Sequence, residues 1–203
     1  MTKRVSINKV DPQLEQLEQV RDVLAAGGLV IIPTETVYGI ACDPSVPGAL
    51  EKLVAAKGRD GNKPIARLAA NTHQVKAVSK HWNSSLQVLA ETYWPGPLTL
   101  VLETSKGWTG FRVPDHPVAL ELARGCKEML ALTSANLSDE PDTQTAQEAI
   151  AAIEADLAID SGPAIEGIPS TVVKVDGSTI ECLREGAIPF QEIKAKFKTP
   201  ELL

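Results

Sequence analysis

The chain has 203 residues and a net charge of −6, with 20 Lys and Arg against 26 Asp and Glu. This length is enough to bury a substantial core, so we expect a single domain over residues 1–203, with its motif-bearing part between about 14 and 190. The acidic balance argues against a protein whose main partner is a nucleic-acid backbone, because such proteins usually present a broad basic surface. A local basic site for a small anion remains compatible with it.

The cysteine spacing and the N-terminal residues indicate the cellular compartment of the protein. Cys42, Cys126 and Cys182 are far apart and lack CxxC spacing, which indicates neither a disulfide framework nor a zinc site. The first residues lack the apolar stretch of a signal peptide, and no apolar run reaches the length needed to span a bilayer. We therefore expect a cytoplasmic protein with no membrane contact and no metal ligands of its own.

The first third of the chain reads as a helix, two extended segments and a short helix. Apolar residues recur every three to four positions from Leu14 to Ala26, behind an N-cap at Asp11-Pro12, which predicts an amphipathic helix. LVII (29–32) predicts a buried strand, and VYGIAC (37–42) continues as extended or turning structure. ALEKLVAAK (49–57) predicts a short helix that leads into a loop.

The middle of the chain alternates between segments with the apolar pattern of strands and segments with that of helices. ARLAA (66–70) is a candidate strand, and helices are expected around 73–80 and 84–93 before the break WPGP. LTLVLE (98–103) is the clearest strand, and GFRVP (110–114) predicts another near it.

The last third ends in a hairpin. A helix is expected from Pro117 to Gly125, and MLALTSAN (129–136) passes from a strand into a polar turn. Thr145 and Glu148 form a capping-box pattern before an alanine-rich helix. Two strand-like segments flank Asp176-Gly177, which is a strong hairpin signal. The whole pattern predicts a mixed α/β sheet with packed helices.

Familiar catalytic signatures are absent from the sequence. There is no GxxxxGK[ST], no GxGxxG after a strand and no GxSxG elbow. His73, His81 and His116 are scattered without metal-ligand spacing, so we expect surface or structural roles for them.

Polar turns stand instead at the ends of apolar runs, where α/β sheets build ligand sites. They are PTETVYG (33–39), TSANLS (133–138) and PST (169–171). Each one alone also fits an ordinary turn. Together, their small hydroxyl and amide groups favour the binding of a polar substrate.

A basic loop adds charge to these turns. In VAAKGRDGNKPIARLAA (54–70), Lys57, Arg59, Lys63 and Arg67 face only Asp60. Arg offers a planar fork for phosphate oxygens and Lys a compact charge, but a solvated basic patch explains the same residues equally well. We expect that replacing Lys57 or Arg59 by Ala would leave the fold intact, because a charge on a loop does little for core stability.

Taken together, these residues resemble the YrdC and Sua5 family, the threonylcarbamoyl-AMP synthases, in its short single-domain form. The motifs PTETVYGIACD, KGR, KPI, WPGPLTLVL, RVPDHP, TSANLS, PSTVV and LREG occur in the family's order between about Gly27 and Arg184. The resemblance implies a YrdC-like fold, in which a twisted mixed sheet with packed helices surrounds a deep basic cavity.

The resemblance also implies a reaction and its partners. L-threonine, bicarbonate or CO2 and ATP would give threonylcarbamoyl-AMP and pyrophosphate, for the threonylcarbamoyladenosine modification of tRNA. Mg²⁺ is expected with the nucleotide. Contacts with tRNA or double-stranded RNA, and with a downstream threonylcarbamoyl-transferase machinery, belong to the same expectation.

The resemblance assigns roles residue by residue. Lys57 and Arg59 would be catalytic and, together with Ser134, Asn136 and Arg184, would bind the nucleotide. The threonine would be bound by Thr34, Arg112, Ser170 and Thr171, with Arg112 pairing with its carboxylate.

The sequence departs from the family pattern at several positions. Asp60 stands where the family often has proline, Leu68 where some members carry a substrate-binding histidine, and Asp139 where glycine is common after SANLS. Trp108 occupies the place of a nucleotide-contacting threonine, with Thr109 beside it. Two alternatives remain open: an RNA-binding or ribosome-associated protein, and a paralogue that acts on another carbamoyl or acyl adenylate.

Overall fold

The fold is described from a computed structural model, in which residues 2–58 and 65–197 are placed. The predictions for Arg59 and Lys63, and the departure at Asp60, lie outside the described residues.

One mixed sheet runs through the molecule. Its order is β1-β8-β2-β3-β7-β4-β6-β5-β9-β10, a ten-stranded sheet with both parallel and antiparallel pairs. The strands are β1 (Lys3–Ser6), β2 (Val30–Ile32), β3 (Gly39–Cys42), β4 (Ala66–Leu68), β5 (Leu98–Thr104), β6 (Gly107–Arg112), β7 (Leu130–Ser134), β8 (Leu157–Asp160), β9 (Thr171–Asp176) and β10 (Thr179–Arg184). The predicted α/β class with a mixed sheet is confirmed.

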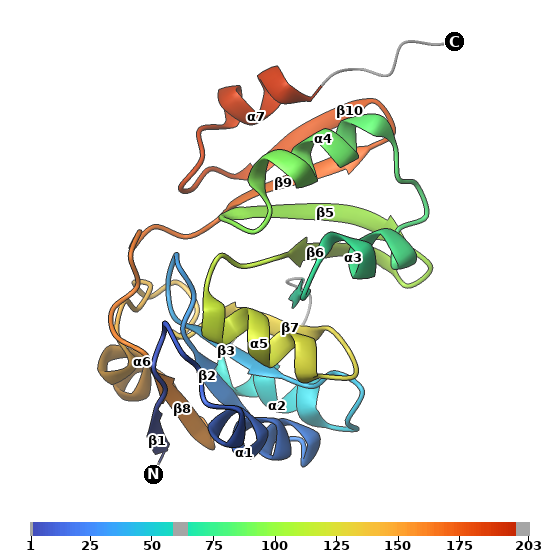
Figure 1. Cartoon of the computed structure of the whole chain (residues 1–203). Helices are drawn as coiled ribbons and strands as arrows, with labels where there is room; N and C mark the ends of the chain where they lie inside the picture. Colours follow the sequence, from blue (N-terminus) through green and yellow to red (C-terminus); the bar gives the residue numbers. More distant parts are fainter. Residues whose placement is uncertain (1, 59–64, 198–203) are drawn as a thin grey trace.

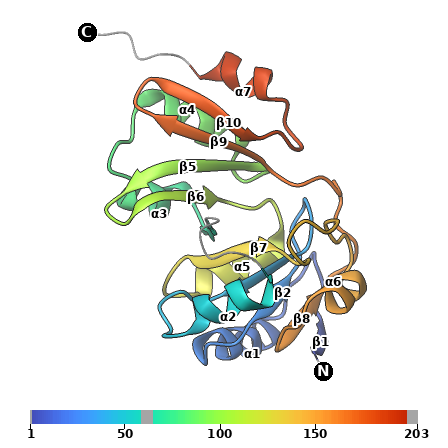
Figure 2. The same cartoon turned by 180° about the vertical axis from the view of Figure 1, so that it is seen from behind.

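Helices lie against the sheet (Figures 1 and 2). The buried apolar side chains form three clusters. The helices are α1 (Leu14–Ala25), α2 (Ala49–Ala56), α3 (Thr72–Val78), α4 (Ser84–Tyr93), α5 (Pro117–Gly125), α6 (Ala146–Ala152) and α7 (Phe190–Lys196). In the half of the sheet that holds β2, β3 and β8, α1 and α5 pack on one face, and α2 and α6 contribute to the core on the other.

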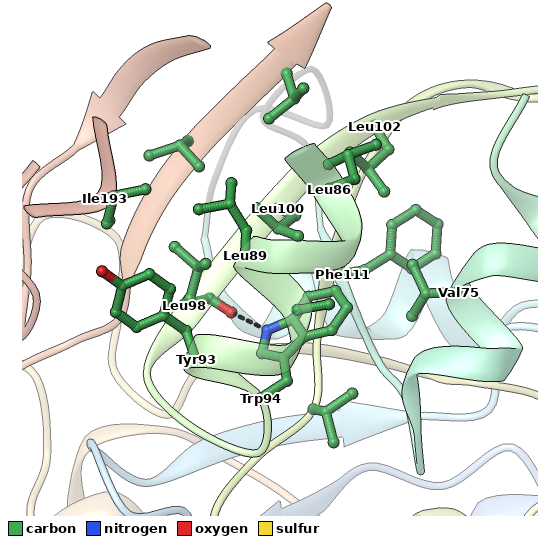
Figure 3. Packing of buried hydrophobic residues seen from close by; sticks show 14 of the residues in the cluster. Val75, Leu86, Leu89, Tyr93, Trp94, Leu98, Leu100, Leu102, Phe111 and Ile193 are labelled. Carbon is green, nitrogen blue, oxygen red and sulfur yellow. Dashed lines mark hydrogen bonds between the residues drawn. The ribbon is translucent and has the colours of Figure 1, made fainter. Parts of the chain in front are cut away.

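The half that holds β5, β6 and β9 is covered differently. Helices α3, α4 and α7 lie over one face, and Figure 2 shows that the described chain places no helix on the other. The cluster under α4 contains Trp94, whose indole N–H donates to the Leu98 carbonyl oxygen at 2.7 Å (Figure 3). This half carries the ends of β6 and β9, where the predicted substrate-binding residues Arg112 and Thr171 lie.

The sequence predictions agree with most elements, and they fail for three segments and one helix cap. The segments β1, β8 and α7 were not predicted. The strands β1 and β8 form a parallel pair between residues more than 150 positions apart, for example Val5 with Ile159. A pattern of neighbouring residues therefore does not predict this pair. The expected N-cap at Asp11-Pro12 is wrong, because Gln13 is the N-cap of α1 and makes no capping hydrogen bond.

Two findings concern what the described residues lack. Within residues 2–58 and 65–197, no helix is long and apolar enough to cross a membrane. The same residues contain no group of three or more His, Cys, Asp or Glu side chains that could hold a metal ion. The deep basic cavity stays a prediction.

Candidate active site

The turns PTETVYG and TSANLS lie side by side because the strands next to them pair. Strands β3 and β7 are antiparallel, with Gly39 opposite Ser134. Beyond the strands, the Ala135 N–H donates to the Tyr38 carbonyl oxygen at 2.9 Å, and the Tyr38 N–H donates to that of Thr143 at 2.8 Å. Sheet pairing therefore brings two of the three predicted polar turns to one place.

Lys57, at the end of α2, holds the TSAN turn together. Its Nζ donates to the carbonyl oxygens of Ser134 at 2.8 Å and Asn136 at 2.5 Å, and to Asn136 Oδ1 at 2.9 Å. Ser134 Oγ donates to the same Oδ1 at 2.6 Å. The structure thus brings three of the predicted nucleotide-binding residues into one hydrogen-bonded cluster.

The solvated basic patch, one of the two interpretations of the loop, does not describe Lys57. Its side chain is buried, with only 3% of the residue exposed. An ammonium group has three donors, and the three oxygens named above match that number. Lys57 therefore organises the turn as well as carrying a charge, so we expect its replacement to destabilise the fold.

Thr34 uses its hydroxyl to close the PTET turn. Oγ1 donates to the Val37 carbonyl oxygen at 2.6 Å and accepts the N–H groups of Thr36 and Val37, each at 3.3 Å. These contacts are those of a side-chain-stabilised turn. The turn holds the backbone of Glu35 in place, and the Glu35 carbonyl oxygen accepts the Glu166 N–H at 2.9 Å.

Glu35 and Arg112 meet beside this turn. Arg112 ends β6, and its Nη2 lies 2.7 Å from Glu35 Oε1, with side-chain exposures of 9% and 6%. Arg112 Nε donates to the Gly96 carbonyl oxygen at 3.2 Å. Among the described residues, neither Glu35 oxygen nor Arg112 Nη2 has a partner with hydrogen-bond geometry, although the two groups are in contact. The pair therefore joins the β2–β3 loop to β6 by charge alone.

His116 lies in the same buried region. It precedes α5, is 4% exposed, and its Nδ1 has no hydrogen-bond partner among the described residues. Burial, with a smaller effect from Lys9, lowers the pKa of His116 to about 4, while Glu35 acts in the opposite direction. The imidazole is therefore neutral at pH 7.

The third polar turn carries Ser170 and Thr171, and Arg184 at the end of β10 contacts it. Ser170 Oγ lies 2.8 Å from Thr99 Oγ1, and Arg184 Nη2 donates to the Ser170 carbonyl oxygen at 2.8 Å and to its Oγ at 3.3 Å. The Thr171 hydroxyl donates to the Ile188 carbonyl oxygen at 2.6 Å and accepts the N–H groups of Gly186 and Ile188. Thr171 thereby fixes the LREG segment against β9.

The charge of Arg184 interacts with charges from other parts of the site. Although Arg184 keeps some exposed surface, burial lowers the pKa of its guanidinium; Asp142, from the loop after TSANLS, opposes this shift, and Arg112 adds to it. Arg184 is therefore attracted by the Asp142 charge and repelled by the Arg112 charge. Contacts therefore join the predicted residues in two groups. The first holds Thr34, Lys57, Ser134 and Asn136 around the paired turns, with Arg112 against Glu35, and the second holds Ser170, Thr171 and Arg184. The Arg112 and Arg184 charges interact between the two groups.

Three departures from the family pattern find a physical account. Asp139 has a φ of 68°, the left-handed conformation that glycine adopts at little cost. Leu68 is buried in the core beneath α1 and α5. Trp108 is 38% exposed, and Lys174 Nζ lies 3.9 Å from its ring centre. A nucleotide role for Trp108 or Thr109 stays open.

Sequence reasoning missed Glu35. It lies within PTET, but one carboxylate in a polar turn predicts no role. For His116 the spacing predicts a surface or structural role, and the side chain is buried. The contact of Glu35 with Arg112, 77 positions later, appears only in the fold.

The comparisons with known proteins agree on the family. The family model for Sua5, YciO and YrdC, described as "Telomere recombination", matches residues 22–186. A Mycobacterium tuberculosis protein is 34% identical over 182 residues, covering 84% of this chain and 83% of that one. A Vibrio cholerae protein named threonylcarbamoyl-AMP synthase is 30% identical, covering 85% of this chain and 98% of its own.

A solved structure is similar over almost the whole chain. The crystal structure of Pyrococcus abyssi Sua5 complexed with L-threonine matches with a TM-score of 0.90 and 28% identity, covering 98% of this chain. The present chain spans 62% of that longer protein. A family match of this extent, together with the ordered motifs and the fold, identifies the chain as a member of the Sua5, YciO and YrdC family.

Proposed function

We propose that this chain is an L-threonylcarbamoyladenylate synthase, a nucleotidyltransferase built on a single YrdC-like domain. The observation that carries the proposal is that the predicted residues contact one another within the three polar turns. They do so in a fold that matches a relative complexed with L-threonine. The related Vibrio cholerae protein carries the name of this activity.

The proposed reaction has two steps. The threonine amine reacts with bicarbonate, forming the N–C bond of a carbamate, while the C–O bond to the hydroxyl breaks and water leaves with an amine proton. A carbamate oxygen then attacks the α-phosphorus of ATP, and pyrophosphate leaves. Both steps bring anions together, which nearby cations stabilise.

The cationic residues suit this task. Arg184 and Arg112 interact electrostatically, and the Lys57 cluster adjoins the PTET turn through Tyr38 and Ala135. We propose that Lys57, Arg59, Ser134, Asn136 and Arg184 bind the nucleotide, and that Thr34, Arg112, Ser170 and Thr171 bind threonine. Mg²⁺ would be carried by the triphosphate, since it commonly keeps water and phosphate ligands.

The test is a reconstituted reaction. Purified protein is incubated with labelled bicarbonate, ATP and L-threonine, and the readouts are labelled adenylate and pyrophosphate release, with threonine omitted as the control. We expect threonine-dependent formation of both products. Folded protein that forms neither would contradict the proposal. Binding of RNA that survives physiological salt would then favour an RNA-binding function.

A further inference from the structure

The Glu35 carboxylate is the least satisfied charged group of the candidate site. Its side chain is 6% exposed, and neither oxygen accepts a hydrogen bond from the described residues. A buried carboxylate normally accepts several hydrogen bonds, because it loses its hydration on burial. The contact with Arg112 at 2.7 Å supplies a counter-charge but no hydrogen-bond geometry.

A purely structural role explains this pair poorly. A buried ion pair offsets the cost of its desolvation only with good geometry and with hydrogen bonds to its remaining lone pairs and protons. Here Arg112 Nη2 and both Glu35 oxygens lack such bonds within the described chain. Their arrangement suits a ligand that brings both donors and acceptors.

An α-amino acid has that chemistry. It carries an ammonium and a carboxylate on the same carbon atom, so two opposite charges lie within a few ångströms. Glu35 and Arg112 present the complementary charges at contact distance. When such a ligand binds, each protein charge exchanges its protein partner for a ligand partner, and no buried charge is left without a counter-charge.

The neighbouring groups favour Glu35 as the ammonium-binding group. The His116 ring is neutral at pH 7 and offers no negative charge. The Thr34 hydroxyl, next in the chain, donates to a backbone carbonyl. The PTET turn fixes Glu35 from both sides, through the Thr34 contacts and through the Glu166 N–H on its own carbonyl oxygen.

We propose that Glu35 binds the α-ammonium group of the amino-acid substrate while Arg112 binds its α-carboxylate. This inference rests on the proposed function, and it places the nitrogen that becomes the carbamate nitrogen beside Glu35. Substrate binding would then replace the Glu35–Arg112 contact with two contacts to the zwitterion.

The experiment compares two ligands on three proteins by isothermal titration calorimetry, with and without ATP. The ligands are L-threonine and its 2-hydroxy analogue, 2,3-dihydroxybutanoate, which has a hydroxyl in place of the ammonium. The proteins are the wild type, Glu35→Gln and Glu166→Gln. Glu166 is the control because it is exposed, adjoins the same turn through its backbone N–H and interacts electrostatically with Glu35 and Arg112. It shows what a nearby carboxylate contributes without contacting Arg112.

We expect Glu35→Gln to weaken threonine binding at least about tenfold. Binding of the analogue should stay the same or become tighter, because its carboxylate no longer has to displace Glu35 from Arg112. Glu166→Gln should change threonine binding by less than about threefold, because exposed charges interact weakly. Circular dichroism checks that each variant is folded. If Glu35→Gln fails to fold, Glu35→Asp, which keeps the charge, should reduce the preference of the protein for threonine over the analogue.

The outcomes separate the inference from the function on which it rests. Threonine binding to Glu35→Gln at wild-type strength, or an unchanged preference in Glu35→Asp, would overturn the assignment. Equal losses for both ligands would also overturn it, because they would mean that Glu35 only positions Arg112. A folded wild type that binds no threonine and makes no adenylate would overturn the proposed function itself.

Discussion

Lys57 is the residue whose environment differs most from its sequence context. A lysine followed by Gly58 looks solvent-exposed, yet its ammonium group is buried against three oxygens of the TSAN turn. Charge-assisted hydrogen bonds of this kind are stronger than neutral ones. The same group can therefore shape the turn and supply positive potential to a phosphate.

Replacing Lys57 with Met should destabilise the protein by about 2 kcal/mol, because three oxygens of the TSAN turn lose a charged donor. Urea-induced unfolding measures this change. The control is Lys52→Met on the same helix: Lys52 is exposed and donates to a single carbonyl oxygen, so we expect a change below about 0.5 kcal/mol. Equal stability of the two variants would contradict the structural role of Lys57.

His116 should make stability depend on pH. Its pKa in the folded protein is about 4, below the ordinary value of 6.5, so the unfolded chain takes up the proton first as pH falls. Stability should therefore decline from about pH 6.5 towards pH 4, with a loss of about 2 kcal/mol at pH 5 from this group.

The measurement is the free energy of unfolding in urea between pH 7.5 and 5. His116→Asn should remove this part of the decline, whereas His73→Asn, at an exposed position of α3, should keep the wild-type profile. A His116→Asn protein with the wild-type pH profile would show that the buried imidazole is not responsible.

At the scale of elements, strand pairing and helix capping place the turns. The Gly39–Ser134 register of β3 and β7 sets PTETVYG beside TSANLS. The helix α6 follows the second of these turns, and its start was correctly predicted. Thr145 and Glu148 form the capping box, with the Thr145 hydroxyl accepting the Glu148 N–H.

Thr145→Ala should cost about 1 kcal/mol, since it leaves a helix N–H without its acceptor. Chemical denaturation measures the loss. Gln13→Ala is the matched control, because Gln13 is the N-cap of α1 but makes no capping hydrogen bond. We expect that control to change stability by less than about 0.5 kcal/mol. Similar losses in both variants would argue against the capping box as the cause.

At the scale of the whole molecule, the net charge of the chain does not describe the charges of single residues at the candidate site. The chain is acidic overall, yet Lys57, Arg112 and Arg184 all lie at the candidate site. Summed charge describes the average surface and does not exclude local cations. A site for small anions would need only such local cations and no broad basic surface.

The sequence by itself determined the α/β class, most of the elements, the three polar turns and the family resemblance. These features depend on local periodicity, turn chemistry and motif order, which neighbouring residues carry. Only the tertiary structure decided the β1–β8 pair, the burial of Lys57, the Glu35–Arg112 contact and the buried position of His116. Each of these joins residues far apart in the chain, and burial changes what their charges can do.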